Sequence, residues 1–291
     1  MRSLFTILLT CLFAAGTLSA QVILDEDFEG GTMPSGWTNQ SLATDGGWNI
    51  GTPSSLSSTY WPVPDVDAGT YIAATNDDNC NCDKSADYLV TPYLDFSDYT
   101  AVVLEFDYFF GGFTYQGATE QAFIEYSTDG GATWTQLYEL PGNGDGWQKD
   151  VVYDLSSLAG EPFLQLAFRY NDNGGWLYGF AIDNVTISAP LANDLELTRL
   201  TIDRFVPTGE SVAVKGIVTN KGANNVTSFT LEWTDGTDTY TDSFPNLDIP
   251  PLGTYEFTAM APFTPSESIT YTISATVTGM NGTMDENPDN N

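Results

Sequence analysis

The sequence predicts an all-β protein made of a jelly-roll-like β-sandwich followed by an immunoglobulin-like β-sandwich. Gly, Asn, Thr and Ser are frequent and helix-forming residues are sparse, which is typical of short strands joined by many turns. Aromatic residues reach 13% while charged residues make up only 16%, so the chain can form a packed core and is not expected to be disordered. Its 291 residues are enough for two domains.

Residues 1–20 have the pattern of a signal peptide. Arg2 supplies the positive charge, residues 4–15 form the apolar core, and Leu18-Ser19-Ala20 precedes Gln21 as a cleavage site. No other apolar stretch is long enough to span a bilayer. We therefore expect a secreted or cell-surface protein whose mature chain has no membrane span.

The first domain is expected over residues 21–189, followed by a linker over 190–192. Its strands are indicated by β-branched and aromatic residues between turn residues. The expected strands are 22–28, 70–74, 88–93, 102–110, 121–126, 133–140, 147–153, 163–170 and 178–187. Because long loops separate several of them, two packed antiparallel sheets fit better than a simple meander. The Ser- and Pro-rich segment 52–66 is expected to be a surface loop.

Two local signals fix details of this domain. Asp129-Gly130 lies between two strands and predicts a hairpin. The surrounding Ser127-x-Asp129-x-Gly131-x-Thr133-Trp134 matches the Asp-box of sialidases, and we interpret it as a brace for the hairpin, in which the carboxylate bonds turn amides and the Trp packs beneath. Asp154 is expected to cap one helical turn.

Cys80 and Cys82 are the two cysteines of the mature chain, because Cys11 leaves with the signal peptide. Export permits a disulfide, but the one-residue spacing leaves open whether the pair is bonded as a small local loop or free. Two thiolates alone do not make a zinc site, which needs about four ligands.

The second domain is expected over residues 193–291. Its strands are predicted at 194–202, 211–220, 229–233, 239–244, 253–260 and 269–278, with the turn spacing of an immunoglobulin-like sandwich. The sequence stops at residues 287–291, where a closing strand is expected. Either this sandwich is truncated or it lacks that strand.

Charge and acid placement point to a cation. The chain has 39 acidic and 8 basic residues and no histidine, which disfavours nucleic acid and anionic membranes as partners. The last strand of the first domain carries Asp183 among apolar residues, and the first strand carries Asp27 and Glu29 at its end. Since chain termini of a domain tend to lie close together, we expect these acids to meet and to hold a structural Ca²⁺, with Asp77 or Asp78 joining from an acidic loop. The alternative is an ordinary solvated acidic surface.

Aromatic residues at predicted loop edges are candidates for ligand binding. They are Tyr60, Trp61, Tyr115, Trp147 and Trp176. Tyr and Trp on loops can stack on sugar or peptide faces while keeping a polar group for hydrogen bonds. The same residues could instead close the ends of the sandwich core, and their spacing does not separate the two interpretations.

The first domain resembles the bacterial choice-of-anchor J and cleaved-adhesin domains, which are relatives of the MAM jelly roll. The matching segments are Asp27-Phe28-Glu29-Gly30 with Pro34-Ser35-Gly36-Trp37, Thr75-Asn76-Asp77-Asp78, residues 87–92, residues 125–134 and residues 179–185. Residues 193–194, 219–222, 233–236 and 288–291 make the second domain similar to the immunoglobulin-like (CARDB-like) modules of Bacteroidetes-type surface proteins. The resemblance implies an adhesion-type extracellular protein, and its cleaved-adhesin part also points to calcium.

These observations together predict a non-catalytic protein that binds a glycan or an extracellular matrix or surface protein, with a structural calcium site. The absence of histidine excludes a Ser-His-Asp triad, and the cysteines have no His partner for activation. Two alternatives stay open. The chain could be, or belong to, an extracellular glycosidase that uses a carboxylate pair, or it could be a passive structural spacer.

Overall fold

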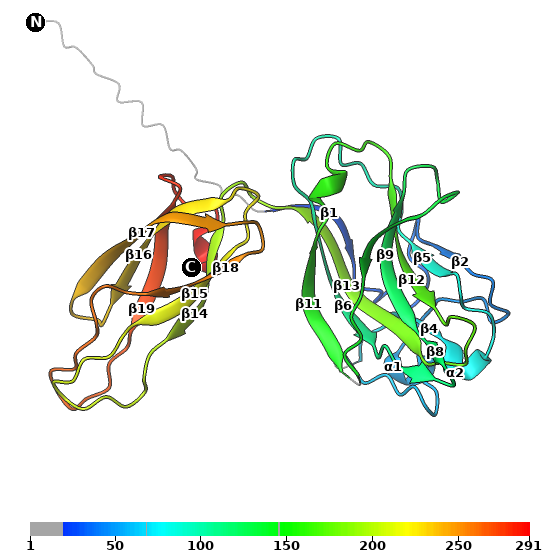
Figure 1. The fold of residues 1–291 in the computed structure, drawn as a ribbon, viewed down its shortest axis with the longest axis horizontal. Coiled ribbons are helices and arrows are strands. Elements are labelled where there is room, and N and C mark those ends of the chain that lie inside the picture. The colour runs from blue at the N-terminus through cyan, green and yellow to red at the C-terminus, as the bar shows by residue number, and fades with distance from the viewer. Residues whose placement is uncertain (1–19, 68, 145) are drawn as a thin grey trace, which may run out of the picture. The chain divides into compact units, whose positions relative to one another are not determined.

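A computed structural model describes residues 20–67, 69–144 and 146–291 (Figure 1). The predicted signal peptide lies outside the described residues, apart from Ala20. The described chain divides into two compact units, 20–190 and 191–291, and each consists of antiparallel β-sheets. The prediction of an all-β protein is confirmed. In the described parts of the chain, no helix has the length and apolar character needed to cross a bilayer.

Two sheets form the first unit. The first sheet has the order β11 (Trp147–Asp154), β6 (Val103–Phe110), β13 (Gly179–Ala189), β4 (Ile72–Asn76) and β3 (Asn49–Gly51), and β1 (Gln21–Glu26) also pairs with β13. The second sheet has the order β10 (Thr135–Glu139), β9 (Gln121–Ser127), β12 (Gln165–Asn171), β5 (Asp87–Val90) and β2 (Thr38–Gln40). Short elements between them are α1 (Pro53–Leu56), α2 (Asp77–Cys80), η1 (Ser156–Leu158) and the hairpin of β7 (Thr114–Tyr115) and β8 (Ala118–Thr119).

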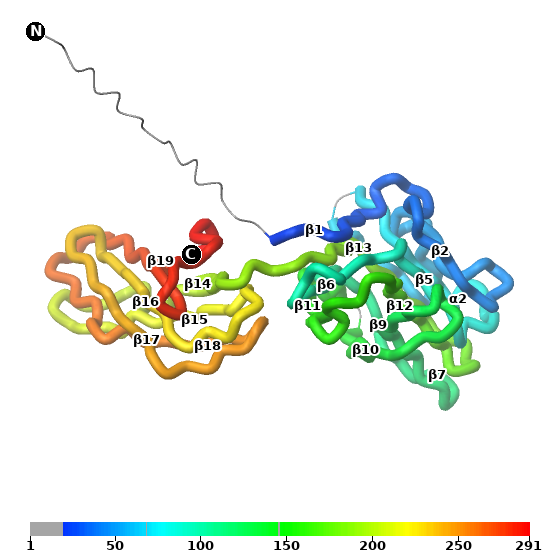
Figure 2. The backbone as a smooth tube through the Cα atoms, turned by 90° about the horizontal axis from the view of Figure 1, so that it is seen from above, coloured from blue at the N-terminus to red at the C-terminus, as the bar shows by residue number. Residues whose placement is uncertain are grey.

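The first and last strands of this unit pair, as the sequence predicts. β1 lies antiparallel to β13, with Gln21 opposite Ala189 and Glu26 opposite Val185 (Figure 2). β6 pairs with one edge of β13, and both β4 and β1 pair with the opposite edge. β4 pairs there with residues 179–182, and β1 pairs further along the same edge. This pairing places the acids that follow β1 alongside β13.

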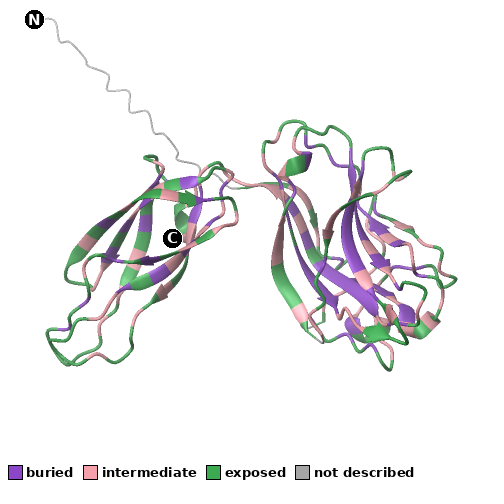
Figure 3. Ribbon diagram, viewed as in Figure 1, coloured by how far each residue is buried: buried purple, intermediate pink, exposed green. Residues whose placement is uncertain are grey.

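The main core lies between the two sheets (Figure 3). The period of two places Leu104, Phe106, Tyr108 and Phe110 of β6 on the inner face, where all four are buried. Phe106 meets Phe168 of the opposite sheet edge to face, with ring centroids 5.0 Å apart, a favoured geometry for aromatic pairs.

The segment 52–66 is not the exposed loop that its composition predicts. β6 and β13 also carry apolar residues on their outer face, Phe109 and Ala181, and this face needs cover. Segment 52–66 provides it through Trp61, Val63 and Val66. The expectation that Trp61 is exposed is therefore wrong: its side chain is only 2% exposed.

The hairpin of β9 and β10 is confirmed, and Asp129 braces it as interpreted. Asp129 Oδ1 accepts from the Thr133 backbone N–H at 2.9 Å, and its Oδ2 accepts from the Thr133 hydroxyl at 2.7 Å. These bonds lower the pKa of Asp129 to about 2. Trp134 stacks on Tyr88 at 5.4 Å. The predicted helical turn is present as a 3-10 turn, Ser156–Leu158, but its N-cap is Leu155 and not Asp154; Asp154 lies one residue earlier, where its Oδ1 accepts from the Ser156 N–H at 2.8 Å.

The second unit contains all six predicted strands in two sheets. One sheet has the order β14 (Leu195–Thr201), β15 (Lys215–Asn220) and β18 (Thr254–Thr258), and the other has β17 (Thr239–Ile249), β16 (Val226–Thr234) and β19 (Ser274–Met280). Their buried faces form a separate core around Phe229, Leu231 and Trp233. At the place of the expected closing strand there is a 3-10 turn, η2 (Pro288–Asn290), and Asn290 donates to Asp194 at 2.8 Å.

Candidate functional site

The acids after β1 leave the strand earlier than the sequence suggests. β1 ends at Glu26, so Asp27 and Glu29 do not lie on one face of a continuing strand. Phe28 adopts a left-handed φ of +55°, which is uncommon for a non-glycine residue. Its N–H donates to Glu26 Oε1 at 2.9 Å, and its ring is buried against Trp37 at 5.6 Å. This turn anchors Phe28 in the core and leaves Asp27 and Glu29 at the surface.

Asp183 lies beside a β-bulge in β13. The register between β13 and β6 shifts between Asp183 and Thr186, where Asn184 has a φ of +52°. Asp183 is directly opposite Asp107 of β6. Bulges of this kind bend a strand and redirect its side chains.

Asp107 connects that bulge to a second one. Its Oδ2 accepts from the Asn184 side-chain amide at 2.9 Å, and its Oδ1 accepts from the Asp150 N–H at 2.7 Å. Asp150 has a φ of +51° and lies where the register between β11 and β6 also shifts. The buried carboxylate of Asp107 thus bonds both irregular segments, one through a side-chain amide and the other through a backbone N–H. Asp107 therefore joins the acidic residues around Asp183.

Asp183 is the least satisfied member of this group. It is 1% exposed; its Oδ1 accepts from the Asn184 N–H at 2.8 Å, while its Oδ2 has no hydrogen-bond partner among the described residues. Burial, with a smaller contribution from the charges of Asp107, Glu29 and Asp27, raises the pKa of Asp183 to about 7, although the Asn184 hydrogen bond acts to lower it. A buried carboxylate in this position needs either a proton or a cation.

Asp77 does not belong to this group, contrary to the sequence-based expectation. It begins α2, its N–H donates to the Tyr178 carbonyl at 2.8 Å, and its Oδ2 accepts from the Leu177 N–H at 2.5 Å. Tyr178 lies five residues before Asp183, which is about 17 Å along an extended strand. Burial raises the pKa of Asp77 to about 7 as well, with nearby Asp172 and Glu120 adding to the effect. One ion cannot use both Asp77 and Asp183.

A third group of potential ligands does not form a metal centre. Asp45, Cys80 and Cys82 offer ligand atoms within 4.8 Å of one another, the one such group in the described part of the chain. Cys80 and Cys82 are joined in a disulfide with their Cα atoms 5.2 Å apart, so their sulfur atoms are not thiolate ligands. Of the two alternatives for these cysteines, the structure contains the bonded pair.

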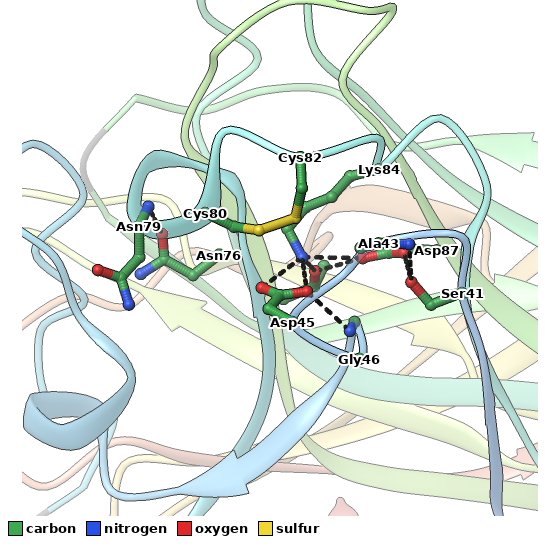
Figure 4. A network of polar contacts seen from close by, with 12 residues as sticks. Ser41, Ala43, Asp45, Gly46, Asn76, Asn79, Cys80, Cys82, Lys84 and Asp87 are labelled. Atoms are coloured by element: carbon green, nitrogen blue, oxygen red, sulfur yellow. Dashed lines mark hydrogen bonds and ion pairs between the residues drawn. A yellow bond between two sulfur atoms is a disulfide. The ribbon is translucent and has the colours of Figure 1, made fainter.

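Next to this disulfide, a buried lysine holds the acidic loop in place. Lys84 Nζ is fully buried and donates to Asp45 at 3.0 Å, and to Asp87 and the Thr75 hydroxyl at 3.2 Å each (Figure 4). The Ser41 hydroxyl also bonds Asp87. These contacts tie the loop that follows α2 to strands β4 and β5, so α2 is attached to a rigid part of the sandwich.

Asp78 of α2 brings two exposed aromatic residues together. Its carboxylate accepts from the Tyr60 backbone N–H at 3.2 Å, and its carbonyl accepts from Trp176 Nε1 at 2.9 Å. Tyr60 is 72% exposed and Trp176 is 48% exposed. Both were predicted ligand-binding candidates, and they come from segments more than a hundred residues apart in the sequence.

Tyr115 extends this group from the hairpin of β7 and β8. The turn before Trp176 packs against that hairpin so closely that a Cβ on Gly175 would lie 2.5 Å from the Ala118 Cβ. Tyr115 pairs with Ala118 and is 45% exposed. Tyr60, Trp176 and Tyr115 are therefore exposed aromatic residues on neighbouring segments at the loop end of the first unit, and we call these three residues the aromatic row.

The other two predicted aromatic residues serve the fold. Trp61 is buried over Phe109, and a Cβ on Gly179 would lie 3.0 Å from its ring. Trp147 is half-buried, lies 5.9 Å from Phe109, and donates from Nε1 to the Pro64 carbonyl at 2.8 Å. Sequence reasoning missed one exposed pair, Tyr93 and Phe163, whose rings stack at 4.1 Å.

No protein-family model matches this chain, and no curated protein matches it either. Among solved structures, it is similar to the K1 and K3 cleaved adhesin domains of Lys-gingipain from Porphyromonas gingivalis W83. The identities are 20% and 17% and the TM-scores 0.42 and 0.41; the matches cover 57% and 58% of this chain and 97% and 99% of those domains. It is also similar to the CBM22-1 xylan-binding domain of Paenibacillus barcinonensis Xyn10C, with 12% identity, a TM-score of 0.39, and coverage of 58% and 95%. At these values the similarities carry no functional argument.

Proposed function

We propose that this protein is a non-catalytic extracellular binding protein that recognises carbohydrate through the aromatic row. The observation that carries the proposal is the convergence of Tyr60, Trp176 and Tyr115, three exposed rings from distant segments, on one end of the first unit. An exposed aromatic ring offers an apolar face for the C–H groups of a sugar and, in Tyr and Trp, a polar group as well.

The support beneath the aromatic row favours binding over simple coverage of the core. Asp78 holds the Trp176 ring through Nε1 and the Tyr60 backbone through its N–H, and α2 is fixed by its bonds to residues 177 and 178 and by the Lys84 contacts. A rigid surface loses little conformational entropy when a ligand binds, which favours affinity. The secreted or surface location and the role of the second unit as a spacer are parts of the same proposal.

A structural Ca²⁺ at Asp183 completes the proposal. Asp183, Asp27 and Glu29 would provide carboxylate oxygens, the hard ligands that calcium takes in proteins, once side-chain rotation brings together oxygens that do not all lie within 4.8 Å of one another. The unpartnered Oδ2 of buried Asp183 fits this role, because a cation beside it would replace the missing hydrogen bond. Since Asp183 lies on β13 and the other two acids follow β1, the ion would join the last strand to the first.

The binding proposal is tested with a glycan array and with Tyr60→Ala and Trp176→Ala. Tyr60 is anchored through its backbone N–H, so its ring can be removed without breaking that bond. We expect each variant to weaken glycan binding by about tenfold, the equivalent of one aromatic contact. Tyr93→Ala, which removes an exposed ring outside the aromatic row, is the matched control and should leave affinity unchanged.

Three outcomes would contradict the proposal. Retention of no glycan by the wild-type protein would leave the spacer alternative. Equal loss of affinity in the Tyr93→Ala control would mean that the aromatic row is not the site. Hydrolysis of a retained glycan, abolished by a single carboxylate-to-amide change, would support the glycosidase alternative.

A further inference from the structure

An open cavity lined by both polar and apolar residues lies beside the segments that carry Trp176 and Tyr115. Its volume is about 540 Å³, and it lies between the ends of β6 and β10, the start of β9 and the turn after β12. Asn173 of its wall belongs to the same turn as Trp176, and Thr119 of its wall belongs to the same hairpin as Tyr115. The cavity and the aromatic row therefore share two supporting segments.

Two glycines shape one wall of this cavity. A Cβ on Gly142 would lie 2.6 Å from the Gly112 Cα, and a Cβ on Gly112 would lie 2.8 Å from the Gly142 Cα. Only glycine allows the two loops to approach this closely, and Gly112 also has a φ of +70°. At these two positions the wall is backbone, and it is flanked by Phe110, Leu140 and Pro141.

The opposite wall is a chain of hydrogen-bonded polar side chains. The Asn173 amide donates to the Thr119 carbonyl at 2.6 Å and to Gln121 Oε1 at 2.8 Å. The Gln121 amide in turn donates to Glu139 Oε1 at 2.9 Å. These side chains lie on three different strands or turns, yet they fix one another's orientation before any ligand arrives.

The groups that remain for a ligand are mostly acceptors. Both amide hydrogens of Asn173 are already used, and Gln121 keeps one. The second carboxylate oxygen of Glu139 makes no hydrogen bond to the described residues, and the carbonyl oxygens of Gln121 and Asn173 can each accept one more bond. An acceptor-rich wall of this kind suits a ligand that presents O–H donors, as the hydroxyl groups of a saccharide do.

The first unit has no spare positive charge for an acidic ligand. Residues 20–190 contain three basic residues, Lys84, Lys149 and Arg169. Each is paired with a carboxylate, Lys84 with Asp45 and Asp87, Lys149 with Asp67, and Arg169 with Glu125. None of the three lines the cavity.

We infer that this cavity is a subsite of the proposed glycan site and that it selects neutral saccharides over those that carry carboxylate or sulfate groups. The inference rests on the proposed function and adds the substrate class. Hydroxyl groups would donate to Glu139, Gln121 and Asn173, while the aromatic row would contact the adjacent sugar faces. Glu139 would repel an anionic sugar, and no basic residue would offset that repulsion.

The test is a glycan array that pairs neutral glycans with forms carrying uronate, sialate or sulfate, followed by titration of the strongest neutral ligand. Asn173 has a φ of +50°, so Asn173→Gly removes the side chain without straining the backbone. We expect this variant to bind about tenfold more weakly, because it loses a hydrogen-bonding group and the one that orients Gln121. Asn246→Gly, an exposed position in the second unit with a φ of +59°, is the matched control and should change nothing.

Glu139→Gln tests the charge separately. The new amide oxygen can still accept from Gln121, so the wall keeps its shape while the charge is lost. We expect the preference for neutral over acidic glycans to fall roughly fivefold, the effect of one charge at about 4 Å in water.

The possible failures are distinguishable. Retention of acidic glycans as strongly as neutral ones, or of a Lys- and Arg-rich peptide in place of any glycan, would overturn the selectivity. If Tyr60→Ala and Trp176→Ala abolish binding while Asn173→Gly does not change it, the cavity is not a subsite and the proposed function stands. If the wild-type protein retains no glycan, both the proposed function and the subsite inference are wrong.

Discussion

Asp183→Asn gives the sharpest test of the proposed calcium site, because its effect on stability should change with calcium. Asparagine has nearly the same shape as aspartate, and its side-chain oxygen can still accept from the Asn184 N–H. What the substitution removes is the charge on a side chain that is 1% exposed and has one unpartnered oxygen.

The size of the effect in a chelator follows from the pKa of Asp183. The pKa rises from 3.8 to about 7 in the folded protein, so the ionised carboxylate disfavours folding by roughly 4 kcal/mol. A raised pKa means that the folded state holds the proton more tightly, so this penalty is absent below about pH 4 and grows as the pH rises to 7. At pH 8 in chelator, we therefore expect Asp183→Asn to be more stable than the wild type, by up to roughly 4 kcal/mol.

Calcium should reverse this order of stability by stabilising the folded wild-type protein. An ion that binds only the folded state stabilises it by about 4 kcal/mol at a thousand times its dissociation constant. The wild type should gain this stability, and Asp183→Asn should gain little of it.

The assay is urea unfolding of residues 21–291 at pH 5 and pH 8, with saturating Ca²⁺ and with chelator. Asp25→Asn is the matched control, because Asp25 is an exposed acid on β1 that bonds the Thr186 hydroxyl. If Asp183→Asn is less stable than the wild type in chelator at pH 8, the argument from the buried charge is wrong. If calcium stabilises the wild type and Asp183→Asn equally, Asp183 is not a ligand of the ion.

Two further predictions concern the polar contacts of the first unit. Lys84→Met should lower the free energy of unfolding in urea by roughly 3 to 5 kcal/mol, because it leaves Asp87 buried without its cation. The control is Lys149→Met, whose partner Asp67 is exposed, and it should lower the free energy of unfolding by at most about 1 kcal/mol. Equal effects of the two substitutions would contradict the role of burial. Asp129→Asn should destabilise the protein near neutral pH, and the difference from the wild type should shrink as the pH falls from about 4 towards 2, because the lowered pKa of Asp129 favours the folded state only while its carboxylate is ionised. A difference that stays constant over this pH range, measured by urea midpoints, would show that the hairpin bonds do not depend on that charge.

Most strands could be predicted because each depends on a short-range pattern, but the short strands β2, β7 and β8 were not predicted. Alternation in β6 identified its inner face, and Asp129-Gly130 identified the hairpin between β9 and β10. The pairing of β1 with β13 followed from the general proximity of domain termini, and it placed Asp183 where the charges of Glu29 and Asp27 act on it, without any knowledge of the intervening fold.

The details of the site depend on features that no local pattern reports. The bulge at Asn184 and the left-handed turn at Phe28 arise from tertiary contacts, and both determine where acids point. Asp107 alternates with Val103 and Glu105 as a solvent-facing residue would, yet it is buried between two bulges. Trp61 was misjudged for a similar reason, since the apolar outer face that it covers is made by strands distant in sequence.

β13 carries the proposed calcium site and supports the proposed binding surface at different positions along its length. Its entry, next to Tyr178, supports α2 and through Asp78 the aromatic row. Asp183 lies about 17 Å further along, where β1 closes the sheet. The bonds that hold α2 come from Leu177, Tyr178 and the Lys84 contacts, and none of them involves the acids around Asp183. A calcium ion at Asp183 would therefore secure the strands that carry the binding surface without contacting the ligand itself.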